Sequence, residues 1–117
     1  MPKLRHTTYF EGPERIYTCS NCHSHIAKHG DVISRAFQGR YGPAFLVTSV
    51  VNVTLGTKEE RMLMTGMHTV ADITCNICNA RLGWKYLHAA ERQQKYKEGR
   101  YIVEKVKVSR EVPWETD

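Results

Sequence analysis

Two Cys-x-x-Cys pairs contain all four cysteines of this 117-residue chain, Cys19 with Cys22 and Cys75 with Cys78. Two intervening residues allow both sulfur atoms of such a turn to face one ion at about 2.3 Å, the usual zinc–thiolate distance. Two pairs together supply the four thiolates of a closed tetrahedral site. The spacing therefore predicts one zinc ion per chain, with iron held by the same four cysteines as the alternative.

Three histidines, His23, His25 and His29, follow the first pair closely and are further candidate ligands. In a zinc finger with two Cys and two His ligands, the first histidine follows the second cysteine by about 12 residues and lies on a helix. These histidines follow Cys22 by one, three and seven positions, so none fits that pattern. We expect them to lie around the metal site or on the surface, with the four cysteines as ligands.

Disulfide bonds and redox chemistry are the other uses of paired cysteines. The N-terminal residues contain no apolar stretch of the kind that a signal peptide requires, so we expect an intracellular protein whose thiols stay reduced. A thioredoxin-like motif needs one pair on a βαβ background, which is not visible in this sequence. Neither alternative explains two matched pairs as well as zinc does.

The same cysteines bear on catalysis. With four thiols assigned to a metal, none remains as a nucleophile, and a zinc ion with four thiolates has no open position for a substrate. His68 and Asp72 lie four residues apart on a predicted strand, where they are expected to form a polar pair, but no nucleophile accompanies them. We therefore predict that the protein is not an enzyme.

The elements that position the cysteines are predicted to be strands. Residues 44–55 and 61–75 are rich in β-branched residues, and Gly66 divides the second run into two strand pieces. Residues 88–99 form the one stretch with good helix formers and predict one to three helical turns. Fifty-two residues separate Cys22 from Cys75. The zinc ion is thus expected to join two hairpins around one core.

Residues 100–110 alternate, which predicts one half-buried strand with Lys105 and Lys107 on one side and these residues on the other: Ile102, Glu104, Val106 and Val108. This strand belongs to the basic segment 79–110, which has nine Lys and Arg and three Glu in a chain of net charge +5. The segment is either the solvated outer face of a strand or a nucleic-acid interface. Four interleaved aromatic residues could stack on bases in the second case: Trp84, Tyr86, Tyr96 and Tyr101.

With these residues in view, the sequence resembles the Yippee-like family. The resemblance rests on both cysteine pairs at the family's spacing and on these stretches: VISRAFQGRYGPAFL (32–46), VVNV (50–53), ERMLMTGMHTVADITC (60–75), LGWKY (82–86) and QKYKEGRYIVE (94–104). It covers about residues 15 to 110. It implies three parts, an N-terminal extension (1–14), a zinc-binding domain (15–110) and a C-terminal tail (111–117).

The resemblance implies a mostly β fold with little helix. Two antiparallel sheets would meet at an angle, in a β-tent pinned by one four-cysteine zinc site. This fold is similar to that of the thalidomide-binding domain of cereblon and of centromere-licensing proteins. Fold alone does not decide function, because these relatives differ in what they do.

For function, the resemblance implies a non-catalytic, zinc-stabilised adaptor of the nucleus and cytoplasm that binds other proteins. Some members associate with the CTLH-type (GID) ubiquitin ligase, which is the concrete form of this hypothesis. We expect no membrane partner and no small-molecule substrate, and nucleic-acid binding through residues 79–110 is the alternative. The candidate partner- or ligand-binding residues are Trp84, Tyr86, His68, Lys105 and Lys107.

The comparison with cereblon also implies a test of ligand binding. Trp84 and Tyr86 match two positions of its aromatic ligand cage, whereas the other two fall on about Met64 and Val70. The cage is therefore incomplete, which argues against a cereblon-type imide ligand. A small apolar pocket beside Trp84 stays open, and so does the choice between a core and a surface role for that tryptophan.

Overall fold

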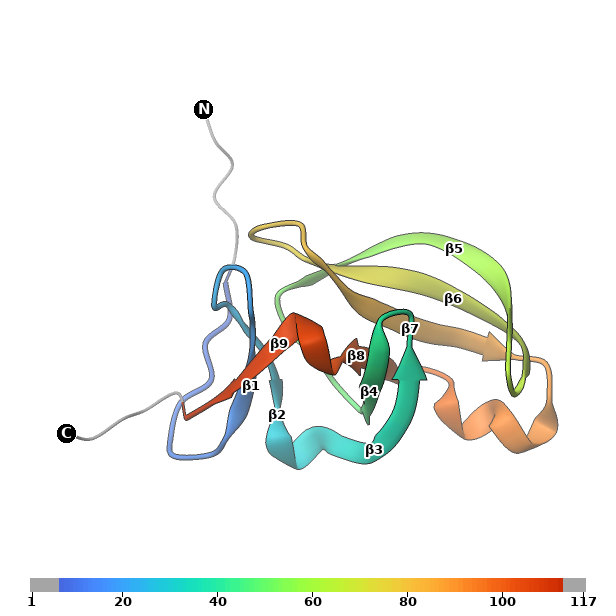
Figure 1. The fold of residues 1–117 in the computed structure, drawn as a ribbon, viewed down its shortest axis with the longest axis horizontal. Coiled ribbons are helices and arrows are strands. Elements are labelled where there is room, and N and C mark those ends of the chain that lie inside the picture. Colours follow the sequence, from blue (N-terminus) through green and yellow to red (C-terminus); the bar gives the residue numbers. More distant parts are fainter. Residues whose placement is uncertain (1–6, 113–117) are drawn as a thin grey trace.

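The computed structural model of the chain describes residues 7–112, which form nine strands and three short 3₁₀ helices (Figure 1). The strands are β1 (Ile16–Cys19), β2 (His25–Lys28), β3 (Val32–Gly39), β4 (Gly42–Val47), β5 (Val53–Leu63), β6 (Gly66–Cys75), β7 (Arg81–Ala89), β8 (Tyr101–Glu104) and β9 (Val108–Glu111). The 3₁₀ helices are η1 (His29–Asp31), η2 (Arg92–Lys97) and η3 (Lys105–Lys107). Among the described residues, no helix is long and apolar enough to cross a membrane.

The strands form two antiparallel sheets, as predicted. Strands β2, β1 and β9 form a three-stranded sheet at one end of the molecule, and β3, β4, β8, β7, β6 and β5 form a six-stranded sheet in that order (Figure 1). The predicted break at Gly66 is confirmed, because β5 and β6 pair as a hairpin whose turn places Gly66 at a φ of 114°. That conformation is one that glycine adopts without a steric penalty.

Apolar side chains cover both faces of the six-stranded sheet. Along β4, Phe45 and Val47 join one buried cluster, and Ala44 and Leu46 join another, because successive side chains of a strand point to opposite faces. The first cluster lies between the two sheets and includes Tyr17, Ile26, Ile73, Leu82 and Val103. The second lies on the opposite face and includes Val70, Trp84, Tyr86 and Ile102.

Gly83 shows how closely the central strands approach each other. A Cβ atom added at this position of β7 would lie 1.9 Å from the carbonyl oxygen of Ile102 on β8. Any larger residue would therefore push apart the β7–β8 pair. This contact explains why the segment that follows the second cysteine pair contains a glycine in the middle of a strand.

The prediction of one strand across residues 100–110 is wrong. Strand β8 ends at Glu104 in the six-stranded sheet, η3 turns the chain, and β9 pairs with β1 in the other sheet. Val106, which the alternation placed on the buried side, is exposed in η3. A local change in backbone conformation is invisible to a pattern that counts alternate residues, so the change of sheet was missed.

The predicted helix over residues 88–99 is also only partly present. Strand β7 continues to Ala89, because His88 and Ala89 pair with Thr69 and His68 of β6. The helical part is the 3₁₀ helix η2, which ends before Gly99. Pairing with a neighbouring strand thus overrides the helix propensity of the first residues.

The predicted extension and tail are described only in part, because residues 1–6 and 113–117 lie outside the described residues. The described part of the extension contacts the domain. The backbone N–H of Thr8 donates to Oδ1 of Asn52 at 2.7 Å, and that of Phe10 donates to Nδ1 of His25 at 2.9 Å. At the other end, β9 runs to Glu111, one residue past the predicted domain boundary.

Candidate metal centre

The two cysteine pairs occupy the turns of two hairpins, one in each sheet. Cys19 ends β1 before the turn to β2, and Cys75 ends β6 before the turn to β7. The backbone N–H of Cys19 donates to the carbonyl of Ser24, and that of Cys75 donates to the carbonyl of Ala80, each at 2.8 Å. The two knuckles therefore repeat one geometry, although they lie in different sheets.

The residue after each second cysteine completes the turn. His23 has a φ of 66° and Asn79 has a φ of 65°. Their backbone N–H groups donate to the carbonyls of Cys19 and Cys75 at 2.7 and 2.8 Å. Asparagine adopts this left-handed conformation more readily than most residues, and the exposed His23 accepts it at a small cost.

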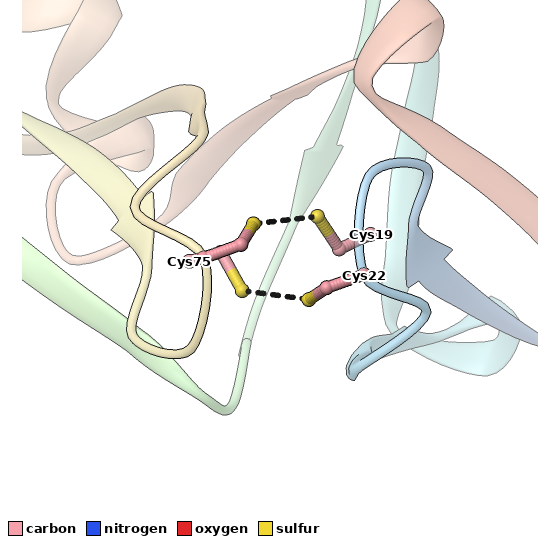
Figure 2. Close-up of side chains that lie close together, drawn as sticks. Cys19, Cys22 and Cys75 are labelled. Atoms are coloured by element: carbon pink, nitrogen blue, oxygen red, sulfur yellow. Dashed lines mark hydrogen bonds between the residues drawn. The ribbon is translucent and has the colours of Figure 1, made fainter.

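The knuckles face each other across a narrow gap, with the sulfur atoms turned inward (Figure 2). Cys19 Sγ lies 3.6 Å from Cys78 Sγ, and Cys22 Sγ lies 3.4 Å from Cys75 Sγ. All four sulfur atoms lie within 4.8 Å of one another. Sulfur atoms around a tetrahedral zinc ion at 2.3 Å are separated by about 3.8 Å, so the donor set and its spacing fit zinc.

A bound zinc ion would join the three-stranded sheet to the six-stranded sheet through these four thiolates. In such a site zinc acts as a crosslink, since all four coordination positions are taken by protein. Joining residues that are more than fifty positions apart restricts the unfolded chain strongly. Each knuckle also has its own backbone hydrogen bonds, which fix the direction of its two sulfur atoms.

The thiols differ in acidity. Burial raises the pKa of the Cys19 thiol to about 12, and burial also raises the pKa of Cys75. Burial acts on Cys78 in the same direction, but hydrogen bonds from the Asn21 side chain and the Ala80 backbone outweigh it and lower the pKa of Cys78 to about 6. Binding of a divalent cation must therefore displace protons from the more buried thiols.

Two of the three nearby histidines have side-chain partners other than a metal. His25 Nδ1 accepts from the Phe10 backbone at 2.9 Å, and His29 Nδ1 lies 2.8 Å from the Tyr17 hydroxyl. His23 is exposed at the turn. Among the described residues, the potential metal ligands at this site are the four cysteine sulfur atoms. His25 and His29 thus contact the N-terminal segment and β1 rather than the cysteines.

Residues 15–117 match the protein family described as "Yippee zinc-binding/DNA-binding /Mis18, centromere assembly". The chain belongs to the Yippee-Mis18 family. A yippee-like protein of Arabidopsis thaliana is 56% identical over 100 residues, covering 86% of this chain and 93% of the relative. Yippee-like protein 4 of Homo sapiens is 46% identical over 115 residues, covering 98% of this chain and 91% of the relative.

The fold agrees with this family assignment. The crystal structure of the Mis18 "Yippee-like" domain superposes with a TM-score of 0.66, covering 89% of this chain and 98% of that domain. Sequence identity over this match is 13%, so it supports the fold and nothing finer. The resemblance to the Yippee-like family, the mostly β architecture with two antiparallel sheets, and the clustering of four cysteines for a metal site are confirmed.

Three of the predicted binding residues of this Yippee-family chain are buried rather than on the outer surface. Trp84 is 5% exposed, Tyr86 is 2% exposed and His68 is 1% exposed. His68 Nδ1 lies 2.8 Å from the carbonyl oxygen of Gly66, whereas Asp72 pairs with arginines, so these two side chains do not form the expected polar pair. For Trp84, the structure favours the core role that the sequence left open.

Trp84 and Tyr86 nevertheless line a cavity of about 700 Å³ on the face of the six-stranded sheet that points away from the three-stranded sheet. Met64, one of the two remaining cage positions, is fully exposed at the rim, and Val70 is buried in the cluster beneath. Two aromatic rings that sequence comparison did not identify, Phe37 of β3 and Tyr96 of η2, also line this cavity. They lie on β3 and η2, which contain none of the four cage positions compared above.

Lys105 and Lys107 lie on η3, half-buried, and not on an exposed strand. Lys105 Nζ donates to the carbonyl of Arg35 at 3.1 Å and lies 5.0 Å from the centre of the Phe45 ring. Lys107 Nζ lies 5.0 Å from the centre of the Tyr41 ring. Both ammonium groups therefore pack on aromatic rings while keeping contact with solvent.

An ion-pair network beside the cavity was not predicted. Glu104, whose side chain is completely buried, accepts from Arg81 Nη1 at 2.8 Å and from the Tyr41 backbone at 3.0 Å. Asp72 bridges Arg81 and Arg61 at 3.3 and 3.0 Å. The sequence contained one indication of this buried ion pair. Glu104 falls on the apolar side of an alternating strand, where a carboxylate without a partner would be costly.

Proposed function

We propose that this chain is a non-catalytic, zinc-stabilised module that binds other proteins. The observation that carries the proposal is the convergence of all four cysteines on one site between the two sheets. A zinc ion held there has four protein thiolates and no position for a substrate, and the chain has no further cysteine to act as a nucleophile. The family match, which is described as zinc-binding, supports the same reading.

The surface that best fits a protein partner is the tip of the β5–β6 hairpin, formed by Met62, Met64 and Met67 and called here the methionine surface. Met62 is 70% exposed and Met64 is 100% exposed, which is unusual for apolar side chains of this size. Methionine is flexible and polarizable, so it adapts to apolar partners of different shape. The hairpin is anchored below, since Lys97 Nζ donates to the Thr65 hydroxyl at 2.9 Å.

In its concrete form, the proposal makes the CTLH-type (GID) ubiquitin ligase the partner, in the nucleus and cytoplasm. This part rests on the resemblance to Yippee-like proteins. The experiment therefore tests the ligase and the general proposal separately. Failure to find ligase subunits would refute the ligase as partner but not the protein-binding role. Failure to find any specific partner would refute both.

Affinity purification from cells at native expression levels tests both levels. The wild-type protein is expected to recover ligase subunits, and Met64→Asp is expected to lose them because a charge replaces an exposed apolar contact. Val106→Asp is the matched control, since Val106 is also an exposed apolar residue, 59% accessible, but lies on η3. Consistent recovery of no ligase subunit would remove the ligase version, and equal recovery by Met64→Asp would remove the methionine surface.

The nucleic-acid alternative has less support from the arrangement of residues 79–110. Two of the four aromatic residues expected to stack on bases, Trp84 and Tyr86, are buried. Arg81 is paired with Asp72 and Glu104, and Lys97 is buried, so neither cation lies on the outer surface where a nucleic-acid backbone would bind. The description of the family includes DNA-binding, which makes the assay worthwhile. We expect no measurable binding to DNA or RNA even at about 50 mM salt, where electrostatic binding is strong.

A further inference from the structure

The cavity over Trp84 and Tyr86 has the size and lining of a small-molecule site. Its volume of about 700 Å³ falls within the range of ligand pockets, roughly 300–1,000 Å³. Aromatic rings line it from three elements: Phe37 on β3, Trp84 and Tyr86 on β7, and Tyr96 on η2. A flat apolar group therefore finds ring surfaces on more than one side.

Lys97 brings a buried positive charge to this apolar cavity. The residue is 3% exposed, and its Nζ lies 5.4 Å from the centre of the Phe37 ring and 5.3 Å from that of the Tyr86 ring. Its one hydrogen bond among the described residues goes to the Thr65 hydroxyl, at 2.9 Å. Two of the three ammonium donors are thus left without an acceptor in residues 7–112.

The other cations of the cavity wall differ from Lys97. Arg61 and Arg81 are held by Glu59, Asp72 and Glu104, and Arg40 is exposed to solvent. No Asp or Glu is among the described residues that line the cavity. A buried ammonium normally has a carboxylate partner, because an uncompensated buried charge is costly. Residues 7–112 do not supply one at this position.

We propose that the cavity binds an organic carboxylate with a flat apolar body, whose carboxylate pairs with Lys97 and whose body packs on Trp84 and Tyr86. A monoanion fits better than a phosphate, because one buried ammonium has no carboxylate partner among the described residues, while the two partly exposed guanidinium groups nearby already have carboxylate partners. This ligand site goes beyond the protein-interaction role, and it departs from the sequence-based expectation that no small molecule is bound.

The acidity of Lys97 agrees with this assignment. Burial lowers the pKa of the Lys97 ammonium from its usual value, so the free cavity disfavours the charge. A bound carboxylate has the opposite effect, because an opposite charge within a few ångströms favours the ammonium. Ligand binding would therefore relieve a cost that the folded protein otherwise carries.

The test compares two probes of nearly the same shape, indole-3-acetate and its uncharged amide, indole-3-acetamide. Both are titrated into the zinc-loaded protein, and the side-chain N–H resonance of Trp84 is followed by NMR. We expect the acid to bind about tenfold more tightly than the amide or better, since a hydrogen-bonded charge is replaced by a neutral group. Equal affinities, or no shift with either probe up to about 10 mM, would overturn the proposal.

Two variants test whether Lys97 is the cation that pairs with the ligand's carboxylate. In Lys97→Met the acid is expected to bind no more tightly than the amide, while the protein stays folded because an uncompensated buried ammonium is replaced by an apolar chain. Arg92→Met is the matched control, because Arg92 lies on the same 3₁₀ helix but is exposed and does not line the cavity. It should keep the full preference for the acid. An unchanged preference in Lys97→Met would refute the pairing.

A second arm distinguishes the source of the carboxylate. A capped tetrapeptide that ends in tryptophan with a free C-terminus is compared with the same peptide carrying a C-terminal amide. Tighter binding of the free-acid peptide than of indole-3-acetate would make the occupant a protein C-terminus, and the reverse order would make it a free organic acid. Both results support the carboxylate site, whereas no preference for either acid over its amide contradicts it.

Discussion

Replacing Glu104 by glutamine should destabilise the protein by about 3 kcal/mol, because it breaks a buried ion pair and leaves Arg81 without its closest counter-charge. The Glu104 side chain is fully buried, and its Oε2 lies 2.8 Å from Arg81 Nη1. Two opposite charges about 4 Å apart attract each other by about 4 kcal/mol at an effective dielectric constant of 20. The neutral glutamine keeps an acceptor for the Tyr41 N–H, and Asp72 still lies 3.3 Å from Arg81, so the loss falls below that figure.

Urea denaturation of the zinc-loaded protein measures this loss as a change in the free energy of unfolding. Glu60→Gln is the matched control, since Glu60 is an exposed carboxylate on β5, and it should change stability by less than about 0.5 kcal/mol. Arg81→Met should also be destabilising, because it leaves the Glu104 carboxylate buried. The double variant should cost less than the sum of the two single changes, since no charge then remains unpaired.

Two results would refute this reasoning. One is a Glu104→Gln protein within about 0.5 kcal/mol of the wild type, which would mean that the buried carboxylate has little net effect. The other is strict additivity in the double-variant cycle, which would mean that Glu104 and Arg81 act on stability independently of each other.

Two further predictions concern the same network and the metal site. Gly39→Ala should destabilise the protein by about 1–3 kcal/mol in the same urea assay, because the new Cβ would lie 2.5 Å from Cγ of Glu104. The Glu104 side chain cannot easily move away, since its carboxylate is held by an ion pair. Gly56→Ala is the control and should be nearly neutral, because its Cβ would meet ordinary contacts at 3.5 Å. A Gly39→Ala protein as stable as Gly56→Ala would contradict this. Zinc affinity should rise at least tenfold per pH unit between pH 6.5 and 7.5, because burial raises the pKa of the Cys19 thiol to about 12 and the proton must leave on binding. Competition with a chelator checks this, and an affinity independent of pH would contradict it.

The sequence predicted the metal cluster well because spacing alone fixes the local geometry of a Cys-x-x-Cys turn. Each pair needs only a hairpin turn to bring its two sulfur atoms to one side, and the strand-rich segments before and after supply the hairpins. That both pairs belong to one site follows from the number of ligands zinc requires. That they lie in different sheets could not be read from spacing, since it depends on strand pairing over long range.

The cavity was predicted less well, because burial depends on contacts between distant segments. Trp84 looked equally suited to core and surface, and only the packing of β3, β5 and η2 around β7 places it with Tyr86 on the floor of a cavity. Lys97 lies in a stretch rich in Lys and Glu, where a lysine is normally solvated, so nothing local marks it as buried. The change of sheet after Glu104 was missed for a related reason, since alternation does not reveal where a strand leaves its partner.

The most direct test of the account is the zinc-to-chain ratio, measured by elemental analysis on the purified wild type, on Cys75→Ser and on His29→Ala. We expect one zinc ion per chain in the wild type, none bound stably in Cys75→Ser, and one in His29→Ala, because His29 contacts Tyr17 and lies outside the group of four cysteines. A folded wild type without zinc, or a Cys75→Ser protein that keeps a full equivalent, would contradict the claim that these four thiols hold the two sheets together.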